Sequence, residues 1–116
     1  MRIGEISKKY GVTRREVDYW TNLGLLHSDD VDEDPVVELS NSYRNYGSKA
    51  EEELKKLIIL KAMGAKIDEE HVEFLDSVPR DMYDICVIQA IKDERDRVMK
   101  QFTMALDFAG ECMERA

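Results

Sequence analysis

The sequence predicts an all-α fold in which four short helices precede one long helix. Three observations support this prediction. Residues that cap helix starts recur just before runs with apolar positions three and four apart. Glycines follow several of these runs, and the stretch 80–115 holds no proline and a single glycine. With 116 residues, of which 43% are hydrophobic and 36% charged, the chain fits one compact domain or a small domain with a long appended helix.

The N-terminal segment predicts two short helices joined by a tight turn. The apolar residues within 3–10 fall on one helical stripe, and Gly11 follows them. Thr13 and Glu16 have the spacing of a capping box, which starts a second helix that closes at Gly24. Two helices in this arrangement have the dimensions of a helix-turn-helix. The side chains left on the outward side of the second helix are Arg14, Arg15, Asp18, Tyr19 and Asn22.

The next segment predicts a short, irregular hairpin of the kind called a wing. Residues 28–35 form a polar loop, Val36, Val37 and Leu39 follow it, and residues 41–48 are rich in turn-forming residues. The two helices and this hairpin together predict a winged helix-turn-helix.

Two further short helices are predicted after the wing. Ser48 and Glu51 have the spacing of another capping box and start a third helix, which a glycine stops. Asp68 caps a shorter fourth helix that ends near Pro79.

The long fifth helix carries an apolar seam along one side. The seam positions from 88 to 112 alternate steps of three and four, and all of them except Arg95 are apolar or small. Nothing in so small a chain covers such a seam fully, so we expect a second copy to pack against it as a coiled coil. The expected dimer contacts are Ile88, Ile91, Val98, Phe102, Ala105 and Ala109, with Cys112 at the far end.

The net charge of -8 is unevenly distributed. Residues 1–28 and 40–50 each carry a net charge of +2, whereas residues 29–39 and 51–116 each carry -6. Exposed charges further apart than about 8 Å are largely screened at physiological salt, so the local balance decides the partner. A nucleic-acid surface must therefore be built from the two basic stretches.

Four stretches of the sequence, taken in order, point to a known family. They are MRIGEISKKYGVTRREVDYWTNLGLL, then SYRNY, then ELKKLIILKAMGAKIDEEHVEFL, then the long helix. Together they resemble the MerR family of bacterial transcription regulators. The resemblance implies a homodimer, joined by an antiparallel two-helix coil, on a pseudo-palindromic promoter site in double-stranded DNA that RNA polymerase also uses. We expect a DNA-binding domain over residues 1–78 and a dimerisation helix over 79–116.

The resemblance also implies which residues contact DNA. On the recognition helix, Arg14, Arg15 and Tyr19 would lie in or beside the major groove. In the wing, the contacts to phosphate would be Tyr43, Arg44 and Tyr46. The alternative is that these arginines belong to a solvated face.

Two residues of the second helix have competing interpretations. Asp18 stands where the family usually has Arg. We interpret it as the partner of Arg14 in an i, i+4 ion pair, and an acceptor for cytosine N4 is the alternative. The helical phase of Trp20 favours core packing over a role in base stacking.

The sequence predicts neither catalysis nor a bound cofactor. His27 and His71 lack the spacing of zinc ligands, and no catalytic triad or phosphate-binding loop is present. Cys86 and Cys112 are expected to be free thiols in or beside the seam. Metal sensing is the alternative, because the two would lie level in an antiparallel pair.

The expected location and a second functional class follow from the remaining features. The first residues contain no apolar signal region and no run is long enough to span a membrane, so we expect a cytoplasmic chain. The acidic run 29–34 is typical of a solvated loop, but it also allows a dimeric adaptor that binds protein through an acidic wing.

Overall fold

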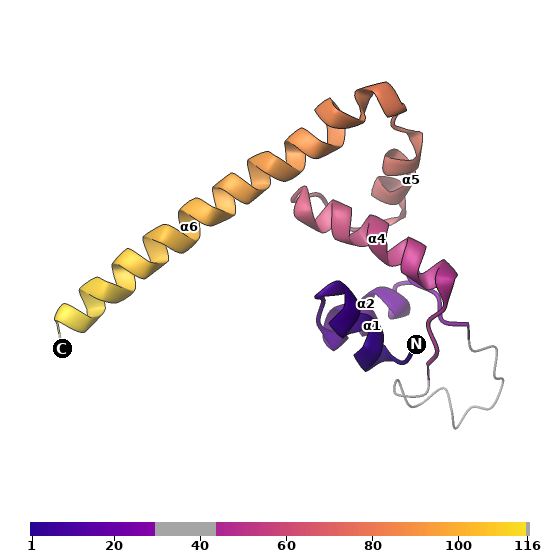
Figure 1. Cartoon of the computed structure of the whole chain (residues 1–116), viewed down its shortest axis with the longest axis horizontal. Coiled ribbons are helices and arrows are strands. Elements are labelled where there is room, and N and C mark those ends of the chain that lie inside the picture. The colour runs from indigo at the N-terminus through magenta and orange to yellow at the C-terminus, as the bar shows by residue number, and fades with distance from the viewer. Residues whose placement is uncertain (30–43, 116) are drawn as a thin grey trace. The chain divides into compact units, whose positions relative to one another are not determined.

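The computed structural model of the chain describes residues 1–29 and 44–115 (Figure 1). Within these ranges the chain is helical and has no strand, which confirms the predicted all-α class for this part. Most of the predicted wing hairpin falls in residues 30–43 and so lies outside the described residues. The chain divides into two compact units, Met1–Leu57 and Ile58–Ala116.

The first unit contains α1 (Ile3–Tyr10), α2 (Arg14–Asn22) and the first part of α4 (Ser48–Ala62). Helices α1 and α2 pack against each other. Of the stripes predicted to face inward, Ile3, Ile6, Val17 and Trp20 are buried, whereas Tyr10 is half-buried and Gly24 is exposed. Removing apolar side chains from water stabilises the unit. The buried residues are Ile3, Ile6, Val17, Trp20, Leu26, Tyr46, Ala50, Leu54 and Leu57.

Local chemistry sets the ends of α1 and α2 as predicted. Gly11 follows α1 with a φ of 68°, and Gly24 lies just beyond α2 with a φ of 77°, a left-handed region that favours glycine. Thr13 Oγ1 accepts the Glu16 backbone N–H at 3.0 Å, and the Glu16 carboxylate accepts the Thr13 N–H at 3.0 Å. The predicted capping box is therefore formed.

The start of α4 shows a contact that its prediction did not include. The helix begins at Ser48, and the Glu51 carboxylate bonds to α1. It accepts hydrogen bonds from Lys9 Nζ at 2.5 Å and from the Tyr10 hydroxyl at 2.8 Å. Glu51 therefore joins α4 to α1. The spacing of residues along the chain does not reveal such a tertiary contact.

The second unit contains the end of α4, α5 (Glu69–Ser77) and the helical path that leads into α6 (Gln89–Glu114). Leu60, Leu75 and Val87 form its buried cluster, and Ile91 is among the half-buried residues packed against it. Asp68 caps α5 as predicted, because its Oδ1 accepts the His71 backbone N–H at 2.8 Å.

The long helix starts less regularly than predicted. In place of one helix from residue 80, a 3-10 turn over Arg80–Met82 and a π-helical turn over Asp84–Ile88 precede α6. The Gln89 N–H donates to the Asp84 carbonyl, five residues back. A π-turn holds one more residue than an α-turn, so it changes which side chains face the core. Val87 is 1% exposed here, whereas Ile85 is 73% exposed.

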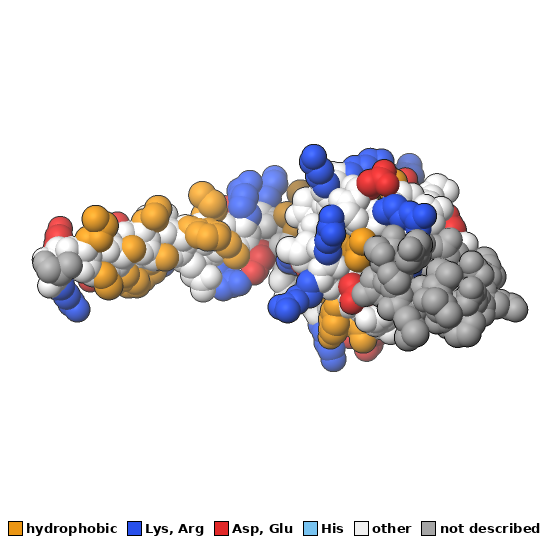
Figure 2. Space-filling model, turned by 90° about the horizontal axis from the view of Figure 1, so that it is seen from below, with side chains coloured by type: hydrophobic (Ala, Val, Ile, Leu, Met, Phe, Trp, Pro, Cys, Tyr) orange, Lys and Arg blue, Asp and Glu red, His pale blue; other side chains and the backbone are white. Residues whose placement is uncertain are grey.

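Helix α6 leaves a long row of apolar side chains uncovered. Its 26 residues extend about 39 Å at a rise of about 1.5 Å per residue. Figure 2 shows hydrophobic side chains gathered along this helix, and Phe102 and Leu106 are 63% and 75% exposed. None of the described helices is both long and apolar enough to cross a lipid bilayer.

Candidate nucleic-acid interface

The outward side of α2 carries the exposed residues predicted to meet DNA. Arg14, Arg15 and Tyr19 are exposed, and we call these three residues the α2 face. The capping box fixes the first turn of α2, from which both arginines project. Among the described residues, neither arginine forms an ion pair, so both guanidinium groups keep their donors for another anion.

Arg14 lies over α1. A Cβ atom placed on Gly4 would come within 2.6 Å of Arg14 Nη2, so the missing side chain of Gly4 leaves space for the guanidinium. The Arg14 guanidinium therefore lies close to the start of α1.

Arg44 contacts α2 as well. Its Nη1 donates to Asp18 Oδ1 at 3.1 Å and its Nη2 to Asn22 Oδ1 at 3.2 Å. The predicted partner of Asp18 was wrong: Asp18 pairs with Arg44 and not with Arg14. The i, i+4 spacing within α2 favoured the pair with Arg14. Tertiary packing instead places Arg44, which is 26 positions away in the sequence, beside Asp18.

Tyr46 also holds its segment to α2, but from inside the unit. Its ring is fully buried and its hydroxyl lies 3.0 Å from Thr21 Oγ1. The Thr21 hydroxyl donates to the Val17 carbonyl at 2.7 Å, so the Tyr46 hydroxyl is the donor to Thr21. A side chain buried in this way has no surface to offer a phosphate. Tyr43, the third expected wing contact, lies outside the described residues.

Other side chains of the first unit contact glutamates of α4. The hydrogen bond with Glu51 raises the pKa of Lys9, and the hydrogen bonds from Lys9 and then Tyr10 lower the pKa of Glu51. His27 bonds to Glu53 through both its backbone N–H and its ring Nδ1, at 3.1 and 2.6 Å. Lys9 therefore serves the contact between α1 and α4, whereas the two arginines of the α2 face have no ion-pair partner in residues 1–29 and 44–115.

The two thiols lie in different surroundings. Cys86 is half-buried and packs against the cluster of Leu60, Leu75 and Val87, whereas Cys112 is exposed near the end of α6. In the described ranges, no group of three or more His, Cys, Asp or Glu side chains is arranged to hold a metal ion.

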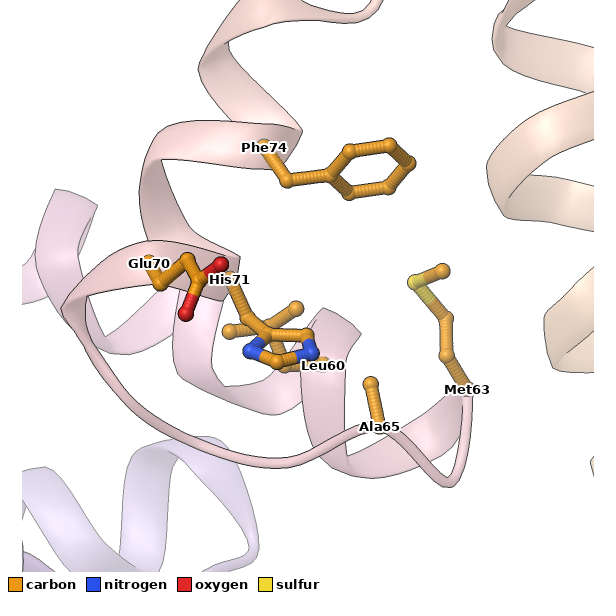
Figure 3. A pocket seen from close by; sticks show the side chains of 6 residues that line it. All are labelled: Leu60, Met63, Ala65, Glu70, His71 and Phe74. Atoms are coloured by element: carbon orange, nitrogen blue, oxygen red, sulfur yellow. The ribbon is translucent and has the colours of Figure 1, made fainter.

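The second unit holds a pocket that the sequence did not indicate (Figure 3). Its volume is about 350 Å³, and it opens between the end of α4 and the exposed side of α5. Met63 lies across the pocket from the His71 ring, and Phe74 lies above both in the view of Figure 3. The His71 ring is held by an Nδ1 contact of 2.6 Å to Asp68. None of the residues expected to bind DNA or the second copy lines it.

The seam residues differ in exposure. Ile88 is 38% exposed, and Ile91 packs on the core of its own unit. Val98 is half-buried, and the later positions Phe102, Ala105 and Ala109 are exposed.

Comparison with known proteins identifies the family of the chain. Residues 1–70 match the family described as MerR HTH family regulatory protein, and this match spans α1, α2 and α4. No curated protein and no solved structure gave a match. Because the family match covers more than half of the sequence and includes the helix pair with the α2 face, the chain belongs to the MerR family of helix-turn-helix regulatory proteins, which are DNA-binding transcription regulators.

Proposed function

We propose that the chain regulates transcription by binding a pseudo-palindromic promoter site as a homodimer. The observation that carries this proposal is the α2 face, with two arginines and a tyrosine exposed on the second helix of a helix-turn-helix. In such motifs the second helix enters the major groove, phosphate contacts fix its orientation and base edges supply the specificity. Arg14 and Arg15 provide donors for phosphate or guanine, and Tyr19 supplies an aromatic contact beside them.

The segment that ends the expected wing has two roles in this proposal. Tyr43 and Arg44 meet the phosphate backbone. Tyr46 acts through position instead, because its buried hydroxyl fixes the segment to Thr21 on α2.

The apolar row on α6 supports the dimer. Phe102 and its neighbours on the seam would expose a large continuous apolar surface on a lone chain, and an antiparallel pair of these helices would cover it. Residues 1–78 then form the DNA-binding domain and 79–116 the dimerisation helix. The proposal places the protein in the cytoplasm, at promoters that RNA polymerase also contacts.

Salt dependence tests the DNA contact directly. A protein that neutralises phosphates releases counterions, so log K falls with log salt concentration by about 0.9 for each phosphate. Replacing Arg14 and Arg15 together with Gln should reduce this slope by about two and weaken binding to the DNA upstream of its own gene. Replacing Lys92 and Lys100 on α6 with Gln is the matched control, because it removes the same charge from another helix. Equal effects in both double variants would show that the α2 face is not the contact.

If the DNA-binding test fails, the dimeric adaptor becomes the better-supported function. If the parent protein binds no duplex at low salt, or binds with an affinity indifferent to salt, a protein partner for the acidic run 29–34 becomes the better proposal. Selection of bound fragments from the source genome would identify the promoter site in the same series of experiments.

A further inference from the structure

Arg44 differs from the two arginines of the α2 face because it already has an anionic partner. Its guanidinium contacts Asp18 and Asn22, which lie one turn apart on α2. The pair is neither buried nor free, since the Arg44 and Asp18 side chains are 23% and 30% exposed. Ion pairs that are partly shielded from water are screened by salt less than fully exposed pairs.

A carboxylate and a phosphate offer Arg44 the same kind of bond. The guanidinium is a planar fork of N–H donors that fits two oxygens of either anion. Asp18 lies on the same helix as the α2 face, so phosphates that approach Arg14 and Arg15 also approach the pair. Two anions then compete for one cation.

We propose that Asp18 competes with DNA phosphate for the Arg44 guanidinium and so sets how tightly the protein binds any duplex. This inference rests on the proposed function. While Asp18 neutralises Arg44, the arginine contributes little to counterion release, because its charge is already compensated within the protein. Asp18 is thus a positioning residue that acts through Arg44, and Asn22 holds the other side of the same guanidinium.

A double-mutant cycle on DNA affinity tests the competition. The proteins are the parent, Asp18→Asn, Arg44→Met and the double variant, each titrated over a range of salt against a fluorescent duplex of about 30 base pairs of mixed sequence. Such a duplex is suitable because phosphate contacts do not depend on sequence. Asp18→Asn should raise affinity roughly two- to fivefold, the range expected for freeing a partly exposed ion pair. It should also steepen the salt slope by about one, and only where Arg44 is present.

Two further variants separate competition from a general charge effect. Asp18→Glu keeps a carboxylate and should restore the parental slope. Lys49→Met removes an exposed cation for which no ion pair is found among the described residues, and its effect should add to that of Asp18→Asn without coupling.

Three results would overturn the inference. An equal gain from Asp18→Asn with and without Arg44 would mean that the carboxylate merely repels DNA. A loss of affinity on Asp18→Asn would mean that Asp18 serves the bound state. Failure of all four proteins to bind any duplex would overturn the proposed function together with this inference, whereas binding without coupling would overturn this inference alone.

Discussion

Tyr46 joins the segment 44–47 to α2 through a single buried hydroxyl. The hydroxyl donates to Thr21, which itself donates to the Val17 carbonyl, so a chain of two hydrogen bonds runs into the backbone of α2. The backbone of the same residue bonds to the N-terminal residue, because the Tyr46 N–H donates to the Met1 carbonyl at 2.6 Å. One residue thus fixes its segment on two sides.

Removing this hydroxyl should lower stability, and any loss of DNA binding should accompany that loss of stability. Tyr46→Phe keeps the buried ring but removes the bond to Thr21, so we expect the free energy of unfolding to fall by about 1 kcal/mol. Urea unfolding measures the change. Tyr19→Ala is the complementary variant, because that residue is 59% exposed and the loss of its ring should weaken DNA binding without changing stability. Weaker DNA binding by Tyr46→Phe at unchanged stability would instead support the phosphate contact expected from the sequence.

At the scale of the element, α5 depends on its capping carboxylate. The pKa of Asp68 is lowered, first by the backbone hydrogen bond from His71 and then by the bond to the His71 ring. A carboxyl whose pKa is lower in the folded protein stabilises it above the unfolded pKa, and this stabilisation is lost as pH falls through the folded value. The pKa values of Glu51 and Glu94 are lowered as well, through Lys9 and Arg97 respectively.

The chain should therefore lose stability in acid, mainly below about pH 4, where free carboxyl groups become protonated. Asp68→Asn keeps an oxygen that can accept the His71 N–H but removes the titrating charge. Its stability should vary less between about pH 5 and pH 3 than that of the parent, as measured by urea unfolding at each pH. Parallel acid profiles for the two proteins would show that the cap does not contribute through its charge.

The elements also show what the sequence could predict. Thr13, Asp68 and Gly11 determined the ends of their helices correctly, because caps and left-handed turns act within about four residues along the chain. Interactions across the fold were not predictable in the same way. Arg44 pairs with Asp18, which is 26 positions away in the sequence, and Lys9 pairs with Glu51, which is 42 positions away.

The candidate site could be predicted in part for the same reason. Helical phase is a local property, so it correctly placed Arg14, Arg15 and Tyr19 outward and Trp20 in the core. The motif that includes Tyr46 gave no sign of its burial, because burial depends on what packs around the residue. The pocket beside Phe74 was missed since its walls come from separate segments.

At the scale of the whole molecule, the proposed dimer depends on the seam of α6. Phe102→Asp puts a charge into the middle of the expected contact, and burying an unpaired carboxylate is costly, so we expect monomers. Light scattering measures the mass in solution and so distinguishes monomers from dimers. Gln101→Asp introduces the same side chain at the preceding position, off the seam, and should leave the dimer intact. An unchanged mass for Phe102→Asp would show that the chains associate through another surface.

The π-helical turn at Asp84–Ile88 has a consequence for how the chain tolerates insertions and deletions. Deleting one residue there would let an ordinary α-turn replace the π-turn, and the residues that follow would keep nearly the same direction, because a π-turn takes up one extra residue within the helix. Deleting one residue from the α-helical start of α6 would instead rotate the rest of the helix by about 100° relative to the cluster around Val87. The seam would then keep its sequence and its period while losing its angular register with the rest of its unit. The loss of one residue should therefore be tolerated better at the π-turn than at the start of α6.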